Sequence, residues 1–277
     1  MKSLWRKRPA CAILLPIKMY NKASNNQIKD WRKLLMGKYR KKNKLFLAEG
    51  LRCVEQIIQN GLIDVTALLS DGSEAAEQLD RGEIPVYELS NDDFASISDT
   101  ETPQGVTAVC RMPAEASIDE IARGDGLIVA LDAIQDPGNM GTIIRTAAWF
   151  GVTAILAGTG CVDPYHPKVV RSTAGATGAV PIIKGDLEDL FSRCESSGWQ
   201  AYLLDGAEDA AEINKITPDK KSVLVIGNEA NGISQNLFTE NRIRVRISGK
   251  SRLVESLNAS VAGGIALEHF SGKPDRF

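Results

Sequence analysis

The 277-residue chain has few histidines and cysteines and no long hydrophobic segment. His166 and His269 are its only histidines, which disfavours a histidine-rich metal site or a Ser-His-Asp triad, although a triad needs only one. The five cysteines are widely spaced and never form a C-x-x-C pair, so a disulfide framework or zinc site is not indicated, and a reducing cytoplasm fits best. The longest apolar run, 10–17, is far shorter than the about 20 residues that span a bilayer. We therefore expect neither metal chemistry nor a membrane span.

The basic residues are unevenly distributed, although 33 Lys and Arg nearly balance 35 Asp and Glu over the chain. Residues 1–44 contain 14 Lys or Arg and one acidic residue, Asp30. Such a segment is typical of proteins that bind a polyanion, because each cation that neutralises a phosphate releases a counterion. A solvated basic helix or a disordered tail is the alternative, and the pattern does not distinguish RNA from DNA or an anionic membrane. The positions that we predict to contact nucleic acid are Arg32, Lys33, Lys38, Arg40, Lys41 and Lys42.

The first half of the chain predicts a small α/β domain over 22–112, after a flexible basic extension at 1–21. Apolar residues repeat at helical spacing in 26–36, and Gly37 ends that pattern. Further helices are predicted at 51–60, 74–79 and 91–97, and strands at 45–48, 65–69, 86–89 and 106–110. Small and polar residues break both periodicities at 113–125, which we interpret as a linker.

Residues 126–277 predict a second α/β domain with a mostly parallel sheet. The apolar strand 127–131 fits burial on both faces, and further strands are expected at 154–156, 180–183, 201–204 and 223–226. Helices are expected at 139–150, 167–176, 187–194 and 258–270.

Three segments near strand ends of this second domain carry more Gly, Asn and charge than packing requires. They read DAIQDPGNMGTIIR at 132–145, VIGNEANGI at 225–233, and RISGK at 246–250 followed by ESLNASVA at 255–262. Ligands of open α/β sheets bind outside the carboxyl ends of strands, so these segments are the candidate site. Neither a P-loop nor a dinucleotide-binding G-x-G-x-x-G is present.

In this order, N-x-G-x-x-x-R, G-N-E-x-x-G and S-L-N-x-S-x-A resemble the three motifs of the SpoU (TrmH-like) RNA 2′-O-ribose methyltransferases of the SPOUT class. PKVVRSTAGA at 167–176 resembles a further block of that family, with Thr in place of its Ser. FLAEG at 46–50 and TPQG at 102–105 resemble its accessory substrate-binding domain. The resemblance covers about 22–272.

The resemblance implies a fold and a reaction. The fold is a SPOUT-type parallel sheet with a trefoil knot, joined to a smaller N-terminal α/β RNA-binding domain. The reaction is methyl transfer from S-adenosyl-L-methionine to a ribose 2′-hydroxyl, without a metal, by a cytoplasmic homodimer whose active site is built from both chains. The two-domain form favours ribosomal RNA, 23S above all. The alternatives are a tRNA 2′-O-methyltransferase, or a non-catalytic RNA-binding or ribosome-assembly factor with the same fold.

The resemblance also assigns roles to residues. Arg145 is the group that activates the hydroxyl; because guanidinium stays protonated, we predict that it stabilises negative charge while the proton leaves to phosphate, water or Glu229. The predicted catalytic residues are Arg145, Asn139, Glu229, Ser256 and Asn258, and the predicted cofactor contacts, partly through backbone, are Gly227, Ile247, Leu257, Ile226 and Asn228.

Each assignment has a structural alternative. Asn139, Ser256 and Asn258 are also suited to cap helices, 227–229 to a tight turn, and Arg145 to a surface ion pair. Arg171 is predicted to contact phosphate or substrate, with a buried salt bridge as the alternative. Nine residues separate Ile247 from Leu257, where eight are common in the family, so the backbone contacts of Ile247 need not match those of the family.

Overall fold

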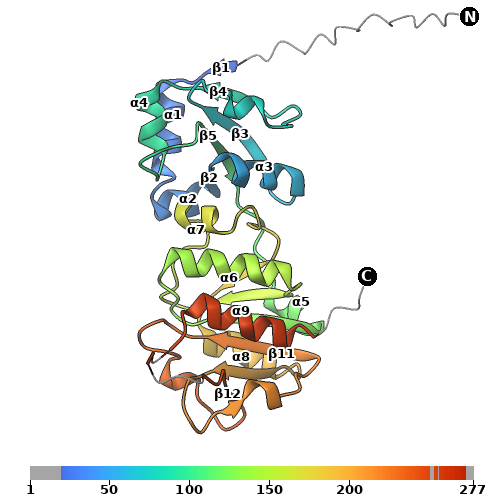
Figure 1. The fold of residues 1–277 in the computed structure, drawn as a ribbon. Helices are drawn as coiled ribbons and strands as arrows, with labels where there is room; N and C mark the ends of the chain where they lie inside the picture. The colour runs from blue at the N-terminus through green and yellow to red at the C-terminus, as the bar shows by residue number, and fades with distance from the viewer. Residues whose placement is uncertain (1–19, 250–252, 255, 273–277) are drawn as a thin grey trace, which may run out of the picture.

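The structure is a computed structural model that describes residues 20–249, 253–254 and 256–272. Two α/β domains follow one another along the long axis of the molecule, and helix α7 (Pro167–Ser172) lies where they meet (Figure 1). The predicted α/β class of both domains is confirmed.

The N-terminal domain is built on a mixed five-stranded sheet with the order β1-β4-β3-β5-β2. Its pattern of alternating burial follows from strand geometry: in β2, Leu47 joins the core on one face while Phe46 and Ala48 join the core on the other. Helices α1 and α4 cover the first face, and α3 with the 3-10 helix η1 covers the second. The strands are β1 (Tyr20–Lys22), β2 (Leu45–Glu49), β3 (Val65–Ser70), β4 (Val86–Glu88) and β5 (Val106–Arg111). The helices are α1 (Asn25–Lys33), α2 (Gly37–Asn43), α3 (Leu51–Asn60), η1 (Glu74–Glu77) and α4 (Asn91–Ile97).

Three features of this domain differ from the prediction. The helix expected over 26–36 ends at Lys33, and Gly37, expected to end that pattern, is the first residue of α2. Tyr20 and Asn21, expected in the flexible extension, belong to β1 and pair in parallel with Val86 and Tyr87 of β4. The rest of the extension lies outside the described residues. The helix predicted over 74–79 is instead the short 3-10 helix η1.

The C-terminal domain has a fully parallel seven-stranded sheet with the order β10-β12-β9-β11-β6-β7-β8. Helices α6 and α9 pack on one face, and α5 and α8 on the other. The strands are β6 (Gly126–Leu131), β7 (Ala154–Ala157), β8 (Ile182–Lys184), β9 (Gln200–Leu204), β10 (Ala211–Glu212), β11 (Lys221–Ile226) and β12 (Ile243–Arg246). The helices are α5 (Ile118–Arg123), α6 (Pro137–Trp149), α8 (Leu187–Glu195), η2 (Ile213–Lys215), η3 (Gln235–Leu237) and α9 (Ala259–Phe270).

Part of the predicted linker is folded. Ile118 of α5 is buried in the core that α5 shares with α8, Ala122 is also buried, and the indole Nε1 of Trp199 donates to the carbonyl of Ala122 at 3.0 Å. The segment 113–125 therefore contains a helix of the second domain, which the small and polar residues around its few apolar positions conceal in the sequence. The trefoil knot is not shown directly by the described residues and stays a prediction.

Two features that would bear on function are absent from the described residues. No helix among them is both long and apolar enough to cross a membrane. No group of three or more His, Cys, Asp or Glu side chains within this part of the chain is placed to hold a metal ion.

Candidate active site

The first two motifs meet because their strands are neighbours. β6 and β11 pair in parallel, with Leu131 opposite Ile226, so the segments that follow them leave the same edge of the sheet. The N–H of Asp132 donates to the carbonyl of Ile226 at 2.9 Å, and the Asp132 carboxylate accepts from the N–H of Ser234 at 2.6 Å. Asp132 thus fixes the second loop against the end of the first strand.

The loop after β11 is a tight turn organised by Asn228. The side-chain oxygen of Asn228 accepts from the N–H groups of Ala230 and Asn231 at 2.9 and 3.0 Å, while its amide donates to the carbonyl of Ala133 at 2.8 Å. A Cβ at Gly227 would lie 2.6 Å from the carbonyl oxygen of Gly232, so a side chain would disrupt the turn. The turn alternative therefore applies to Gly227 and Asn228, and the Asn228 side chain holds the loop.

A chain of hydrogen bonds joins the three motifs. The amide of Asn139 donates to the Glu229 carboxylate at 2.7 Å, and its carbonyl accepts from the amide of Asn258 at 2.9 Å. Asn139 is only 7% exposed, and it uses both ends of its amide. Glu229 and Asn258 follow Asn139 by 90 and 119 positions in the sequence. The hydrogen bonds thereby hold all three residues in one cluster at the carboxyl edge of the sheet. The structure brings together Asn139, Glu229 and Asn258, three of the residues predicted to be catalytic.

The helix starts show which residues act as caps. Asp136 caps α6, since its carboxylate accepts from the N–H of Asn139 at 2.8 Å, and Pro137 opens the helix. Asn139 is thus free of the capping role. Asn258 caps α9 through its carbonyl oxygen, which accepts from the N–H of Ser260 at 3.0 Å, and its amide still reaches Asn139, so it has both roles. Ser256 is exposed and has no hydrogen bond within the described part of the chain.

Arg145 lies apart from this cluster. It follows Asn139 by six residues on α6, about 9 Å along the helix axis and on a different side of the helix. It is exposed and has no ion-pair partner among the described residues, so the surface-pair alternative is not found. Its helix face also carries Trp149, four residues later, which is 84% exposed.

Four of the predicted cofactor residues lie at or just after the ends of β11 and β12, and Leu257 lies just before α9. Ile226 ends β11 and is buried against α9, where a Cβ on Gly263 would lie 2.8 Å from its side chain. Ile247 follows β12 and is half-buried, while Leu257 is 46% exposed. Apolar side chains beside backbone N–H and carbonyl groups suit an adenosine, whose ring is flat and apolar and whose edges form hydrogen bonds. The residues present therefore fit S-adenosyl-L-methionine. Lys250, Arg252 and Glu255 of the longer loop lie outside the described residues.

Among the predicted RNA contacts, Arg40 is a correction. Its side chain is 2% exposed, its guanidinium binds Asp163 at 2.7 Å, and it donates to the carbonyls of Leu34 and Leu35 at 2.9 Å. Arg40 therefore stabilises the contact between the domains and is not available to a phosphate. The cluster of basic residues in 1–44 does not indicate the burial of Arg40, because its partner Asp163 lies 123 positions away in the sequence.

The other basic residues differ in whether their side chains already bind a partner within the protein. Lys38, Lys41 and Lys42 are exposed on α2. Arg32 donates to the Ser96 hydroxyl and Lys33 pairs with Asp30 at 2.8 Å, both near the protein surface. Arg171 pairs with Glu49 and Asp99 at 3.0 Å each, so the salt-bridge alternative is the one found for it. In the sequence, Glu49 stands out only as part of a motif, and nothing marks Asp99 or Asp163.

Comparisons with known proteins decide the family. Residues 126–268 match the model described as SpoU rRNA Methylase family, and residues 25–108 match the MRM3-like substrate binding domain. The chain belongs to the SpoU rRNA Methylase family. This SpoU protein is 33% identical over 258 residues to the 23S rRNA (guanosine(2553)-2'-O)-methyltransferase RlmP of Bacillus subtilis, covering 92% of this chain and all of that one.

Two solved structures show the same two-domain fold. The SpoU methyltransferase AviRb from Streptomyces viridochromogenes, in complex with AdoMet, matches at a TM-score of 0.77 and 27% identity, covering 90% of this chain and 97% of that one. The AdoMet-bound rRNA methyltransferase from Sinorhizobium meliloti matches at 0.76 and 29%, covering 91% and 96%. The predicted family, the accessory domain, the S-adenosyl-L-methionine cofactor and the RNA 2′-O-methyltransferase class are confirmed.

Proposed function

We propose that this SpoU protein methylates a ribose 2′-hydroxyl of 23S ribosomal RNA. The observation that carries the proposal is the Glu229–Asn139–Asn258 hydrogen-bond chain, which assembles the three motifs into one site. The choice of RNA is supported by the Bacillus subtilis relative and by the 23S rRNA (uridine(2479)-2'-O)-methyltransferase of Streptomyces viridochromogenes, which is 28% identical over 255 residues. An intact site argues against the non-catalytic alternative.

The residues of this chain have separate tasks in the reaction. Bound S-adenosyl-L-methionine would supply the methyl group as a sulfonium. Arg145 donates hydrogen bonds to the ribose oxygen and stabilises the negative charge that develops as its proton leaves. Glu229, oriented by Asn139, is a carboxylate available to accept that proton.

A homodimer explains why Arg145 lies apart from the cluster. Helices α6 and α9 lie side by side (Figure 1) and together expose apolar side chains that a monomer would leave in water. These side chains are Trp149, Val261 and Ile265, with Leu257 just before α9. Because Arg145 shares the face of Trp149, pairing two copies through this surface places the arginine of each chain at the other chain's site.

Replacing Ile265 by Lys tests the dimer, because it buries an unpaired charge in the interface. Sedimentation should show a monomer that still binds S-adenosyl-L-methionine and has lost turnover. A dimeric Ile265→Lys protein with full activity would contradict this interface.

We also place the RNA near α2 and the protein in the cytoplasm. Lys38, Lys41 and Lys42 are exposed on one short helix without an acidic partner in the described residues, which suits phosphate contacts. The cysteines described, Cys53, Cys110, Cys161 and Cys194, are all free, which fits a reducing compartment.

The activity is tested with methyl-labelled S-adenosyl-L-methionine and separate pools of unmodified 23S rRNA and tRNA, followed by digestion to nucleosides. Label should appear as 2′-O-methylnucleoside from 23S rRNA. Arg145→Ala should abolish it with S-adenosyl-L-methionine binding nearly unchanged, whereas the control Arg193→Ala, an exposed arginine paired with Asp119, should keep the wild-type rate. Label only in tRNA, or full activity of Arg145→Ala, would contradict the proposal.

A further inference from the structure

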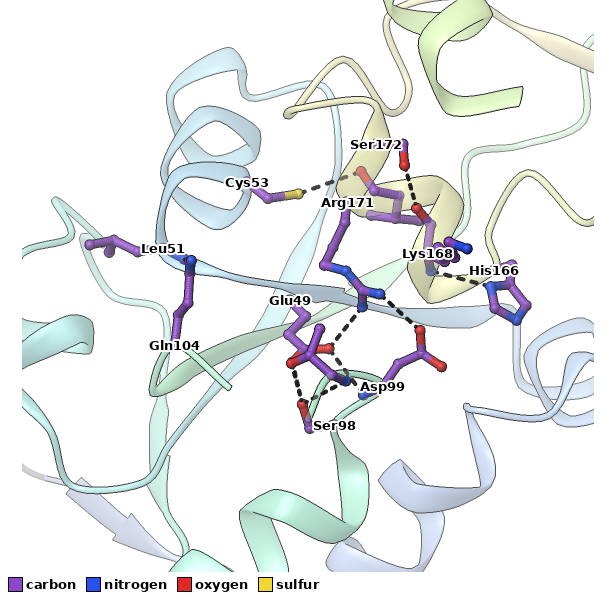
Figure 2. A network of polar contacts seen from close by, with 12 residues as sticks. Glu49, Leu51, Cys53, Ser98, Asp99, Gln104, His166, Lys168, Arg171 and Ser172 are labelled. Atoms are coloured by element: carbon purple, nitrogen blue, oxygen red, sulfur yellow. Dashed lines mark hydrogen bonds and ion pairs between the residues drawn. The ribbon is translucent and has the colours of Figure 1, made fainter. Parts of the chain in front are cut away.

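A buried carboxylate lies where the two domains meet. Glu49, the last residue of β2, is 3% exposed, and its carboxylate accepts four hydrogen bonds. The donors are the hydroxyls of Ser98 and Thr100, the N–H of Asp99 at 3.1 Å and the guanidinium of Arg171 at 3.0 Å (Figure 2). A buried carboxylate requires such compensating donors, and here the two hydroxyls, one backbone N–H and one guanidinium supply them.

Arg171 enters this cluster from the other domain. It lies on α7, and its two terminal nitrogens bind two different carboxylates of the N-terminal domain, Glu49 and Asp99, at 3.0 Å each (Figure 2). The planar guanidinium thus holds both acids in a fixed geometry, which a lysine would not reproduce. The segments 46–50 and 167–176, which resemble family motifs, meet here, and the side chain of Gln104 from 102–105 accepts from the N–H of Leu51 nearby at 3.2 Å.

Helix α7 passes the position of Arg171 on to the active site. It packs backbone to backbone against α6, because Gly141 of α6 has no side chain: a Cβ there would lie 2.6 Å from the carbonyl oxygen of Val169 and would overlap Ser172. Helix α6 carries both Asn139 and Arg145. A movement of α7 relative to the N-terminal domain is therefore a movement of the catalytic helix relative to that domain.

Two other sets of contacts hold the domains together at this junction, apart from the Glu49–Arg171–Asp99 cluster. Val170 is buried in the core of the N-terminal domain, where the thiol of Cys53 donates to its carbonyl at 3.7 Å. Asp163 joins Arg40 of α2 to Lys184 of the catalytic domain at 2.7 and 2.9 Å. The Glu49–Arg171–Asp99 cluster is a further ion-pair link across the boundary, and it is the one formed by α7 itself.

We propose that Glu49 and Arg171 are positioning residues that fix the orientation of the RNA-binding domain relative to α6. RNA held near α2 then presents its target ribose to the active site at a set distance. This inference rests on the proposed function for its substrate, while the ion-pair link itself does not depend on it. The competing role for Arg171 is a direct phosphate contact, and the two roles differ in what they predict for Glu49.

Three variants separate the roles. Glu49→Gln keeps the size of the side chain and removes its charge, Arg171→Gln removes the cation, and the third combines both. Asp99→Asn is a milder change at a partly exposed partner, for use where a buried substitution prevents folding. The matched control is Arg111→Gln, which breaks an exposed ion pair with Asp64 in the N-terminal domain.

Each variant is assayed for S-adenosyl-L-methionine affinity, rRNA affinity, kcat and hydrogen exchange in α7. We expect both affinities to stay within about threefold of the wild type, while kcat falls about 10- to 100-fold, as for a catalytic group misplaced by about 1 Å. The double variant should be no worse than either single variant, because the two residues act as one unit. Exchange of the α7 amides should rise in all three, and the control should match the wild type. Asp99→Asn should change kcat and exchange in the same direction, by less.

The opposite pattern would overturn the proposal. If Arg171 binds phosphate, Arg171→Gln weakens rRNA binding and lowers its salt dependence, while Glu49→Gln frees the arginine and strengthens binding. Unchanged kcat and unchanged α7 exchange in Glu49→Gln would also refute the link. A wild-type protein that does not methylate rRNA would contradict the proposed function, and hydrogen exchange would still decide whether the link holds the domains together.

Discussion

Replacing Gly141 by Ala tests whether the close contact of α6 with α7 is required. Gly141 lies inside α6, where alanine is the better helix former by about 1 kcal/mol. Propensity alone thus predicts a more stable protein. The structure predicts the reverse, because the new Cβ would lie 2.6 Å from the carbonyl oxygen of Val169 and 3.0 Å from the carbonyl carbon of Ser172.

The net effect follows from the two opposing terms. Both contacted groups belong to the backbone of α7, so they cannot turn away as a flexible side chain does. Overpacking of this kind costs about 1–3 kcal/mol, and a backbone clash belongs at the upper end of that range. After subtracting the helix-propensity gain, we expect a loss of about 2 kcal/mol in the free energy of unfolding. For a chain of this size, that corresponds to a fall of about 4–8 °C in Tm.

The assay is urea unfolding at fixed protein concentration, with Gly264→Ala as the matched control. Gly264 is also inside a helix, but the nearest atom to its added Cβ is a methyl group of Thr146 at 4.0 Å. The control should therefore gain up to about 1 kcal/mol. A Gly141→Ala protein as stable as the wild type, or as stabilised as the control, would refute the backbone contact and with it the coupling of α7 to α6.

Two further predictions concern the junction. Arg40→Gln should lower the free energy of unfolding by about 3–5 kcal/mol, because it breaks a buried ion pair. Lys41→Gln should keep the wild-type stability and lower the slope of log Kd for RNA against log salt by about 0.7–0.9. Equal effects of the two variants in urea unfolding would contradict the burial of Arg40. Burial alone would raise the pKa of Asp163, but its hydrogen bonds and charge attraction with Lys184 and Arg40 outweigh burial and hold that pKa below its usual value. The Asp163 carboxylate therefore contributes stability that is complete above about pH 4 and is lost as the pH falls further. Urea midpoints measured from pH 6 to 3 should fall more steeply for the wild type than for Asp163→Asn. Parallel curves for the two proteins would contradict a stabilising role of the Asp163 carboxylate.

Elements with strong local signals were predicted from the sequence. The helix predicted over 51–60 is α3, and the apolar run 127–131 is the buried strand β6. The strand β12 was missed, because Arg244 and Arg246 give it a polar pattern. In the structure their guanidinium groups pair with Asp205, Asp209 and Glu212, which lie far from them in the sequence.

The same distinction between local signals and distant partners holds for the residues of the candidate site. The family motifs identified Asn139, Glu229 and Asn258, and the structure adds the bonds that join them. A count of charges, however, cannot separate the buried Arg40 from the exposed Lys41 beside it, because the difference depends on Asp163 in the other domain. The separation of Arg145 from Asn139, by contrast, follows from their spacing of six residues on one helix.

The burial of Val170 also bears on how the chain folds during synthesis. The core of the N-terminal domain contains Val170, and Tyr165 packs against that core, yet the last strand of that domain ends at Arg111. The ribosome adds about 5–20 residues per second, so several seconds separate the end of this domain from the arrival of the side chains that complete it. Until then one apolar face of the nascent domain is exposed to water. The second domain therefore completes the folding of the first.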